Sequence, residues 1–498
     1  MAAALLTRRY LAEYARRPLN LVLLVVVPVI FVALASGAIA DFAEIVGGVA
    51  DAGQLAAPTA GWAAAFLAGV AGFFHVLGSR EADRRLSLAG IGPSRVMTAR
   101  LTSGLGLAFL AVAAALVTLA VRTGIADAVR AVAGTLMFAI IYLGIGVAIG
   151  AVVKSDVNGS LVVIFVWMLD VFLGPAMAGS GVWVTRIFPS HYVTLVMLDS
   201  ASGHAGPIGD LGWAAVWTLG SLALAAVVFA TATSNGWARR VVNRPGGWHR
   251  LGAGLRFAFR DYRRNVAMWV LLVVLPIFFI TLSFYVTPDD LTPVELIESG
   301  VTAISLTSMI DVHGAIMVPI TIGFLSGLAG LFVVQGSVDA DARLALAGFR
   351  PREILASRLG VVTLAALLTS AVSLAVTAFE FSAQAWGWFA AGSALVAVAY
   401  ALVGVVVGAV FGRLGGLYVM FLLPFIDVGI AQNIMFSAAP PDWGVALPAR
   451  GAVQVLVDAA FTPTLDRTGG LLLALVWLGG LGLVAAFVFR QIAAPRRA

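Results

Sequence analysis

The sequence contains no cysteine and only one lysine, Lys154, and charged residues make up just 11% of its 498 positions. The absence of cysteine excludes disulfides, thiolate metal sites and cysteine nucleophiles. The scarcity of charge excludes an ordinary soluble domain, because a chain that is 61% hydrophobic cannot keep that much apolar surface away from water. The preference for arginine over lysine is typical of a GC-rich bacterial genome.

The apolar residues form stretches of about twenty residues, the length that crosses a bilayer as a helix. The first stretch is too long for the apolar region of a signal peptide and is not followed by a convincing cleavage site, so we interpret it as a membrane span. We predict twelve spans, six in each half of the chain. They cover residues 19–40, 60–79, 98–121, 129–153, 158–178, 212–233, 266–286, 313–335, 353–379, 385–411, 415–437 and 469–490.

Positive charge is distributed unevenly between the predicted loops. With the N-terminus inside, the inner loops hold all but five of the 31 basic residues, as the positive-inside rule requires. The pattern predicts a multi-pass protein of the bacterial inner (plasma) membrane with both termini in the cytoplasm. The net charge of +6 then belongs to the cytoplasmic face and indicates contact with anionic lipid of the bilayer, not with nucleic acid.

Two segments of the chain recur. The stretch "RRLSLAGIGPSRVMTARL" at 84–101 returns as "ARLALAGFRPREILASRL" at 342–359, identical at eight of eighteen positions and displaced by 258 residues. The stretch "YLGIGVAIGAV" at 142–152 returns as "YALVGVVVGAV" at 400–410 with the same displacement. Such self-similarity indicates an internal duplication.

Each half has an even number of predicted spans, so both halves enter the membrane from the same side and form parallel repeats. We therefore predict an all-α polytopic membrane protein of twelve transmembrane helices in two six-helix repeats. The first half covers 1–233 and the second 253–498. A polar, basic and glycine-rich segment, 234–252, joins them as a cytoplasmic linker.

A basic amphipathic stretch precedes the first span of each half, at 5–17 and 253–265. Apolar and basic side chains on adjacent helical faces are typical of a helix lying in the membrane interface. The alternative is a simple orientation signal. The residues on which this prediction depends are Arg8, Tyr14, Arg16, Arg256, Arg260, Tyr262 and Arg264.

The repeated stretch lies in the cytoplasmic loop between the second and third spans of each half, at 80–95 and 338–353. Each copy has a charged turn, then Leu-x-Leu-Ala-Gly, then a proline. The glycine predicts a helix end and the proline a new helix start. The mixed charges favour a protein partner, although an ordinary charged connector is the alternative. The candidate docking residues are Glu81, Asp83, Arg84, Arg85, Leu86, Gly90, Pro93, Asp339, Asp341, Arg343, Leu344, Gly348 and Pro351.

Asp170 and Asp427 occupy matching places in the fifth span of their halves. A carboxylate at the bilayer centre costs roughly 2.5–3.5 kcal/mol on insertion scales, so we expect both to face the protein interior. Three interpretations stay open: an acidic pair lining a substrate pathway, a structural hydrogen bond, or a position near the outer mouth, where the fifth span breaks at Gly174 and Pro175. His75 in the second span is expected to form hydrogen bonds inside the helix bundle or to lie near the inner interface.

Glycines at four-residue spacing recur in the fourth span, at Gly146 and Gly150 and again at Gly404 and Gly408. Small residues at this spacing allow the backbones of two membrane helices to approach closely. We therefore predict tight helix packing at these four positions.

This arrangement resembles the permease of an ABC-2 type exporter, of the same broad class as the ABCG-like, or type V, fold. In that family each six-span half begins with an interfacial helix, and the loop between spans 2 and 3 carries a coupling helix that docks on an ATPase subunit. A short re-entrant helix between spans 5 and 6 caps the pathway on the outer side. The matching segments here are 5–17, 253–265, 80–95, 338–353, 187–199 and 446–458.

The fused two-half permeases of tetronasin-type and multidrug exporters in actinobacteria show the same organisation. The resemblance implies ATP-driven export of small hydrophobic or amphipathic compounds, such as drugs, antibiotics or ionophores, and hence multidrug efflux and antibiotic resistance. It also implies two copies of a separate ABC ATPase subunit as partners. ATP and Mg are expected on that ATPase.

The chain carries no G-x-x-x-x-G-K-[ST] motif, and Lys154, its sole lysine, has no glycine directly before it. We therefore expect it to hold no cofactor and not to be an enzyme by itself. A proton-coupled carrier of the major facilitator type is the main alternative, since it also has twelve spans in parallel halves. In "GSREADRR" at 78–85, however, Gly78 lies five residues before Asp83, where that family expects four.

Overall fold

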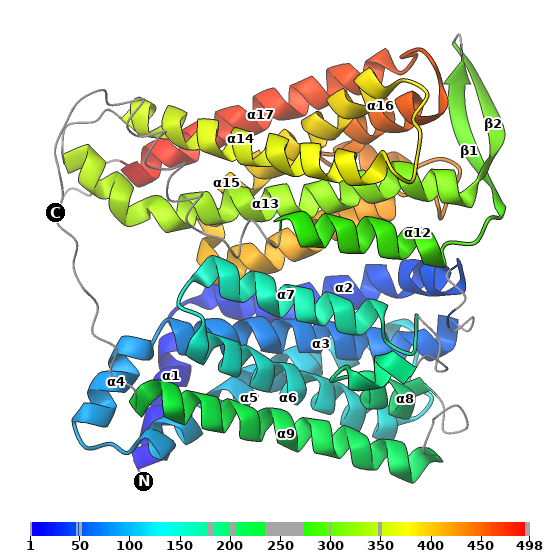
Figure 1. Cartoon of the computed structure of the whole chain (residues 1–498). Coiled ribbons are helices and arrows are strands. Elements are labelled where there is room, and N and C mark those ends of the chain that lie inside the picture. The colour runs from blue at the N-terminus through cyan, green and yellow to red at the C-terminus, as the bar shows by residue number, and fades with distance from the viewer. Residues whose placement is uncertain are drawn as a thin grey trace. The chain divides into compact units, whose positions relative to one another are not determined.

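The computed structural model describes residues 2–45, 48, 52–177, 183–198, 206–234, 272–298, 300–346 and 351–493. By internal packing the chain divides into two compact units, Met1–Val242 and Asn243–Ala498. Long helices dominate each unit (Figure 1). The division falls inside the segment that we interpret as a linker.

Helices joined by short loops make up the described residues of the first unit. Its elements are α1 (Ala2–Ala15), α2 (Pro18–Ile45), α3 (Ala52–Leu77), α4 (Arg80–Leu88), α5 (Pro93–Arg122), α6 (Ala128–Val152), α7 (Asp156–Phe172), the 3-10 turn η1 (Trp183–Ile187), α8 (His191–Leu198) and α9 (Gly206–Ser234). Within this unit, α1 and α4 lie at one end of the long helices and α8 lies at the other (Figure 1).

The second unit combines long helices with a β-hairpin. Its elements are η2 (Ile277–Thr281), α12 (Leu282–Val286), β1 (Leu291–Glu298), β2 (Val301–Ser308), α13 (Met309–Leu346), α14 (Pro351–Thr377), α15 (Trp386–Pro424), η3 (Phe425–Ala431), η4 (Asp442–Ala446), α16 (Arg450–Phe461) and α17 (Thr468–Ala493). Of these, η2 and η3 are π-helical and η4 is a 3-10 turn.

Nine helical segments in the described part of the chain are long and apolar enough to cross a membrane, which confirms a multi-pass membrane protein. One of them, Trp386–Ala431, covers two predicted spans. The two remaining predicted spans correspond to α7, which has 17 residues, and to the shorter apolar helix Leu272–Val286. The residues just before Leu272 lie outside the described part.

The fourth and fifth predicted spans of the second half run together as α15, and a sharp kink separates them. At the kink Gly412 has φ 70° and ψ −165°, a backbone conformation that only glycine adopts without strain. In the first unit the corresponding spans are two separate helices: α6 ends at Val152 and α7 begins at Asp156.

The glycine spacing in the fourth span produces close helix crossings in both units, as predicted. Gly146 of α6 lies directly against the backbone of Gly69 in α3, and Gly404 of α15 lies against Gly327 of α13. At either glycine a Cβ would overlap the carbonyl oxygen of the facing residue. The two crossings are related by the same 258-residue displacement, so the duplication extends to the packing.

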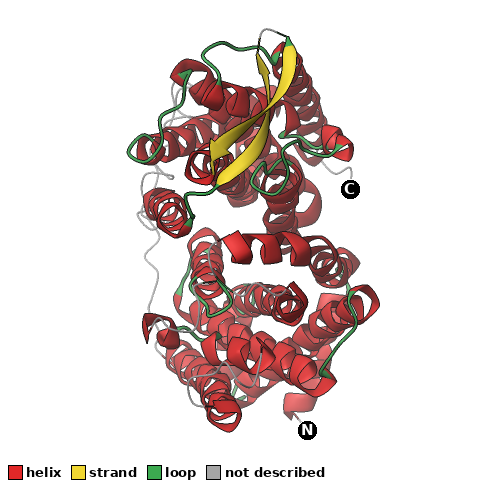
Figure 2. Ribbon diagram, turned by 90° about the vertical axis from the view of Figure 1, so that its right-hand side faces the viewer, coloured by secondary structure: helices red, strands yellow, loops and turns green. Residues whose placement is uncertain are grey.

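The β-hairpin was not predicted, but it is a small addition to a chain whose described residues are otherwise dominated by helices, as expected of an all-α polytopic membrane protein. β1 and β2 pair antiparallel, with Leu291 opposite Ser308 (Figure 2). On β1 the side chains of Val294 and Leu296 are buried, whereas β2 is exposed along most of its length. An ion pair from Arg467 to Glu295, 3.2 Å, fastens the hairpin to the loop before α17.

Candidate functional site

The repeated loop of the first unit folds as predicted, into a short helix that stops at a glycine. Gly90 follows α4 with φ 89°. The backbone N–H of Gly90 donates to Ser87 O at 3.2 Å and that of Ile91 to Leu86 O at 3.0 Å, which together form a Schellman motif. Pro93 then begins α5. The glycine and the proline thus fix the angle between α4 and α5.

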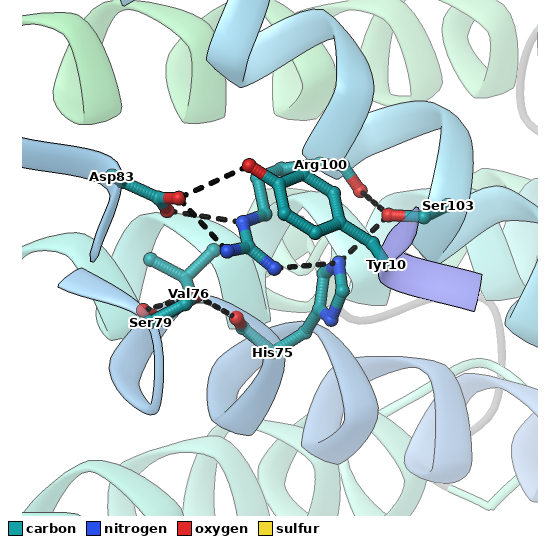
Figure 3. Close-up of polar contacts among 7 residues, drawn as sticks. All are labelled: Tyr10, His75, Val76, Ser79, Asp83, Arg100 and Ser103. Atoms are coloured by element: carbon teal, nitrogen blue, oxygen red, sulfur yellow. Dashed lines mark hydrogen bonds and ion pairs between the residues drawn. The ribbon is translucent and has the colours of Figure 1, made fainter. Parts of the chain in front are cut away.

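The carboxylate of Asp83 lies in the interior at this end of the unit. Arg100 of α5 contacts both of its oxygens, Nη2 to Oδ1 at 2.8 Å and Nε to Oδ2 at 3.0 Å. The hydroxyl of Tyr10 in α1 donates to Oδ1 at 3.2 Å (Figure 3). Asp83 is 0% exposed and Arg100 4%. A single carboxylate therefore joins α1, α4 and α5.

Two rings surround the guanidinium of Arg100. The Tyr10 ring lies beneath it, with its centroid 3.5 Å from Cζ, a cation–π contact. His75 of α3 meets Tyr10 edge to face, and its Nε2 lies 2.7 Å from Ser103 Oγ and 3.5 Å from Arg100 Nη1 (Figure 3). The expectation that His75 forms hydrogen bonds within the bundle is confirmed.

Burial raises the pKa of Tyr10 to about 12; the charge of Arg100 opposes this rise and the charge of Asp83 adds to it. The phenol therefore keeps its proton near neutral pH and remains a hydrogen-bond donor to Asp83. We call Tyr10, His75, Asp83, Arg100 and Ser103 the Asp83 cluster.

The opposite face of α4 is exposed and charged. Glu81 and Arg85 form an ion pair one helical turn apart, 3.3 Å, with side chains 70% and 76% exposed. Leu86 is half-buried, and the structure does not describe the side chains of Arg84 and Pro93. The expectation that Asp83 belongs to this exposed charged turn is wrong, because its side chain points inward to Arg100.

The loop of the second unit differs from that of the first. The repeat had predicted a separate short helix here. Instead α13 continues without a break through Asp339, Asp341, Arg343 and Leu344, so the described residues of this loop contain no such helix. The side chains of those four residues and the whole of Gly348 lie outside the described part. Pro351 begins α14, as predicted.

The N-terminal amphipathic stretch forms the helix α1, as predicted. Arg8 and Arg16 are exposed and Tyr14 is half-buried. The corresponding segment of the second half, with Arg256, Arg260, Tyr262 and Arg264, lies outside the described residues.

Sequence reasoning missed Tyr10 and Arg100 as members of the cluster. The sequence could have indicated Arg100, because it is one of the eight identical positions of the repeated stretch and returns as Arg358. Tyr10 and His75 have no counterpart in the second half, where Val333 stands in the place of His75. Nothing in the repeat could have pointed to them.

The two intramembrane carboxylates are buried, each within its own unit. Asp170 of α7 is 1% exposed and Asp427 of η3 is 0% exposed. Each accepts a hydrogen bond from a tyrosine hydroxyl, Tyr142 at 2.6 Å and Tyr400 at 2.7 Å respectively. Of the segments expected to be re-entrant, 187–199 contains the short helix α8, and α16 begins within 446–458 and continues to Phe461.

Comparison with known proteins gives one family. Residues 62–234 match a family described as "ABC-2 family transporter protein". The match runs from α3 to the end of α9, and it includes α4, Arg100 and Asp170. Over these residues it confirms the predicted resemblance to an ABC-2 type permease. No curated protein matches the chain.

Proposed function

We propose that this chain, an ABC-2 type permease by its match at residues 62–234, is the transmembrane subunit of an ATP-driven exporter. It works by alternating access with two copies of a separate ABC ATPase, which bind ATP and Mg. Its substrates are small hydrophobic or amphipathic compounds, and its location is the bacterial inner membrane. Multidrug efflux and antibiotic resistance are the activities expected of such a protein.

The observation that carries the proposal is the two-sided character of α4. One side presents the exposed pair Glu81 and Arg85 to a partner. The other side is fixed through Asp83 to Arg100 at the start of the long helix α5 and to Tyr10 of α1. A force applied to the exposed face therefore reaches a membrane-spanning helix through a buried two-point ion pair, as coupling of an ATPase to a permease requires.

The distribution of charge supports an orientation with α1 and α4 in the cytoplasm. Both helices lie at the same end of the first unit (Figure 1). Their exposed arginines include Arg8, Arg9 and Arg85, and the exposed Arg16 directly follows α1. Clustered arginines next to membrane spans are retained on the cytoplasmic side. An ATPase that uses cytoplasmic ATP would dock at this end.

The proposal is tested by coexpressing the chain with the genes that neighbour its own and purifying it in detergent. We expect an ATPase to copurify at two copies per chain. Proteoliposomes containing the complex are then expected to move a lipophilic dye across the membrane, away from the side that carries the ATPase, when ATP and Mg are supplied on the ATPase side. A chain that purifies alone and moves the dye with a proton gradient would overturn the proposal in favour of a secondary carrier.

A further inference from the structure

The same three-part contact occurs in both units, far from α4 in the first of them. A tyrosine of the fourth span, a carboxylate of the fifth span and the backbone N–H just before a short helix meet in the interior. We call Tyr142, Asp170 and Ser190 the first latch. We call Tyr400, Asp427 and Ala449 the second latch.

In the first latch the carboxylate of Asp170 joins three elements. Tyr142 Oη of α6 donates to Oδ2 at 2.6 Å. The backbone N–H of Ser190 lies 3.2 Å from each carboxylate oxygen. Ser190 directly precedes His191, the first residue of α8. Asp170 thus connects α6 and α7 to the beginning of α8.

In the second latch Asp427 makes the same connections. Tyr400 Oη of α15 donates to Oδ2 at 2.7 Å, and the backbone N–H of Ala449, the residue before α16, donates to it at 2.9 Å. This latch has an additional polar layer. Gln432 donates to Asp427 Oδ1 at 3.4 Å, and Arg450 donates to Gln432 Oε1 at 3.0 Å.

The same physical reasons explain the contacts of Asp170 and Asp427. The start of a helix carries unsatisfied N–H groups and partial positive charge, so a carboxylate is favourable there. In a low-dielectric interior such a carboxylate is tolerated only when hydrogen bonds satisfy it. The tyrosines, 1% and 0% exposed, have no water to bond instead. Each partner therefore holds the others in place.

We infer that Asp170 and Asp427 are positioning residues, each latching a short helix, α8 or α16, to two membrane helices of its own unit. This interpretation takes the place of a substrate-lining role, because both carboxylates are covered and occupied by protein donors. On the proposed function, α8 and α16 lie on the exit side, and opening of the latches would let substrate leave. That last step rests on the proposed function, whereas the latches themselves rest on the geometry.

The absence of cysteine makes a site-specific test possible. A single cysteine is placed in α8 (Val193→Cys) or in α16 (Val455→Cys), at positions whose side chains are 0% exposed. The labelling rate of the purified full chain with a water-soluble maleimide then measures how often each short helix opens. Each cysteine is combined with Tyr142→Phe, with Tyr400→Phe, or with Tyr285→Phe, which removes an exposed hydroxyl outside the latches.

We expect Tyr142→Phe to raise labelling at position 193 about tenfold or more and to leave labelling at position 455 unchanged. Tyr400→Phe should do the reverse, since a hydrogen bond to a charged group shifts an opening equilibrium by roughly 10- to 100-fold. Tyr285→Phe should change neither rate. Unchanged labelling in both latch variants, or an equal rise at both positions in either one, would overturn the inference.

A second measurement distinguishes a failure of the latch inference from a failure of the proposed function. In the complex with its ATPase, ATP is expected to raise labelling in the parent chain and to raise it by a smaller factor in the matching tyrosine variant, whose latch already opens more often. If no ATPase binds, the exporter proposal fails, yet the nucleotide-free labelling still tests the latches. If ATP drives transport but the tyrosine variants label like the parent, the latches fail alone.

Discussion

The guanidinium of Arg100 contacts both carboxylate oxygens of Asp83, and neither side chain is more than 4% exposed. The two residues belong to consecutive helices, α4 and α5, that the Gly90 turn and Pro93 set at a fixed angle. Because a buried charge without its counter-charge is costly, the pair fixes α4 to the long helix at this end of the unit. The exposed face of α4 can therefore act on α5 as part of one rigid piece.

Breaking this ion pair is expected to destabilise the fold strongly. Asp83→Ala leaves the charge of Arg100 buried and unpaired, which costs about 3–5 kcal/mol in comparable pairs. Thermal unfolding in detergent should show a large fall in Tm. The matched control is Glu81→Ala, which removes an exposed pair worth at most about 1 kcal/mol and should leave the Tm nearly unchanged. Similar small effects for both variants would contradict the burial of Asp83.

Reversing the exposed pair tests the docking role of α4 without disturbing the interior. The double variant Glu81→Arg, Arg85→Glu keeps the ion pair but places each charge at the less favourable end of α4, so its Tm should fall only slightly. We expect transport per ATP hydrolysed to fall severalfold, because the surface presented to the ATPase is altered. Parent-like coupling in reconstituted vesicles would remove these residues from the docking surface.

The raised pKa of Tyr10 predicts a loss of stability at high pH. A phenol whose pKa is about 10 when unfolded and about 12 when folded contributes stability that is fully present below pH 10. That contribution declines as the pH rises from 10 towards 12. Tyr10→Phe should lower the Tm at pH 8 by losing the hydrogen bond to Asp83, and the difference from the parent should shrink between pH 10 and 12. A constant difference would show that Tyr10 does not ionise in this range.

The repeated glycine crossings predict a position-dependent effect of adding one methyl group. Gly146→Ala and Gly404→Ala place a Cβ against the backbone of the facing helix, and overpacking of this kind typically costs 1–3 kcal/mol. Gly220→Ala in α9, where nothing lies within 4 Å, should be neutral or slightly stabilising. The comparison needs only the Tm and the yield of folded protein. An equal change in Tm for all three variants would contradict the close helix crossings at Gly146 and Gly404.

The sequence by itself determined the long apolar helices, the duplication and the helix break at Gly90 and Pro93. Hydropathy predicts spans because lipid offers no partner to the backbone, so an apolar stretch of this length must satisfy its own N–H and C=O groups as a helix. Glycine and proline predict helix ends because their backbone preferences are local, and Gly90 and Pro93 do so here. Gly146 and Gly404 predict close packing because a missing side chain leaves room for a backbone.

Only the tertiary structure decided which way the charged side chains face. Asp83 and Glu81 are two residues apart on α4, and no local preference tells that one is buried and the other exposed. The choice depends on Arg100 and Tyr10, which lie on other helices. The contacts of Asp170 with Tyr142 and Ser190, 28 and 20 positions away, depend likewise on packing. Hydropathy and turn chemistry act between neighbours in the chain, whereas the partner of a buried charge is whichever group the packed helices bring within hydrogen-bond distance.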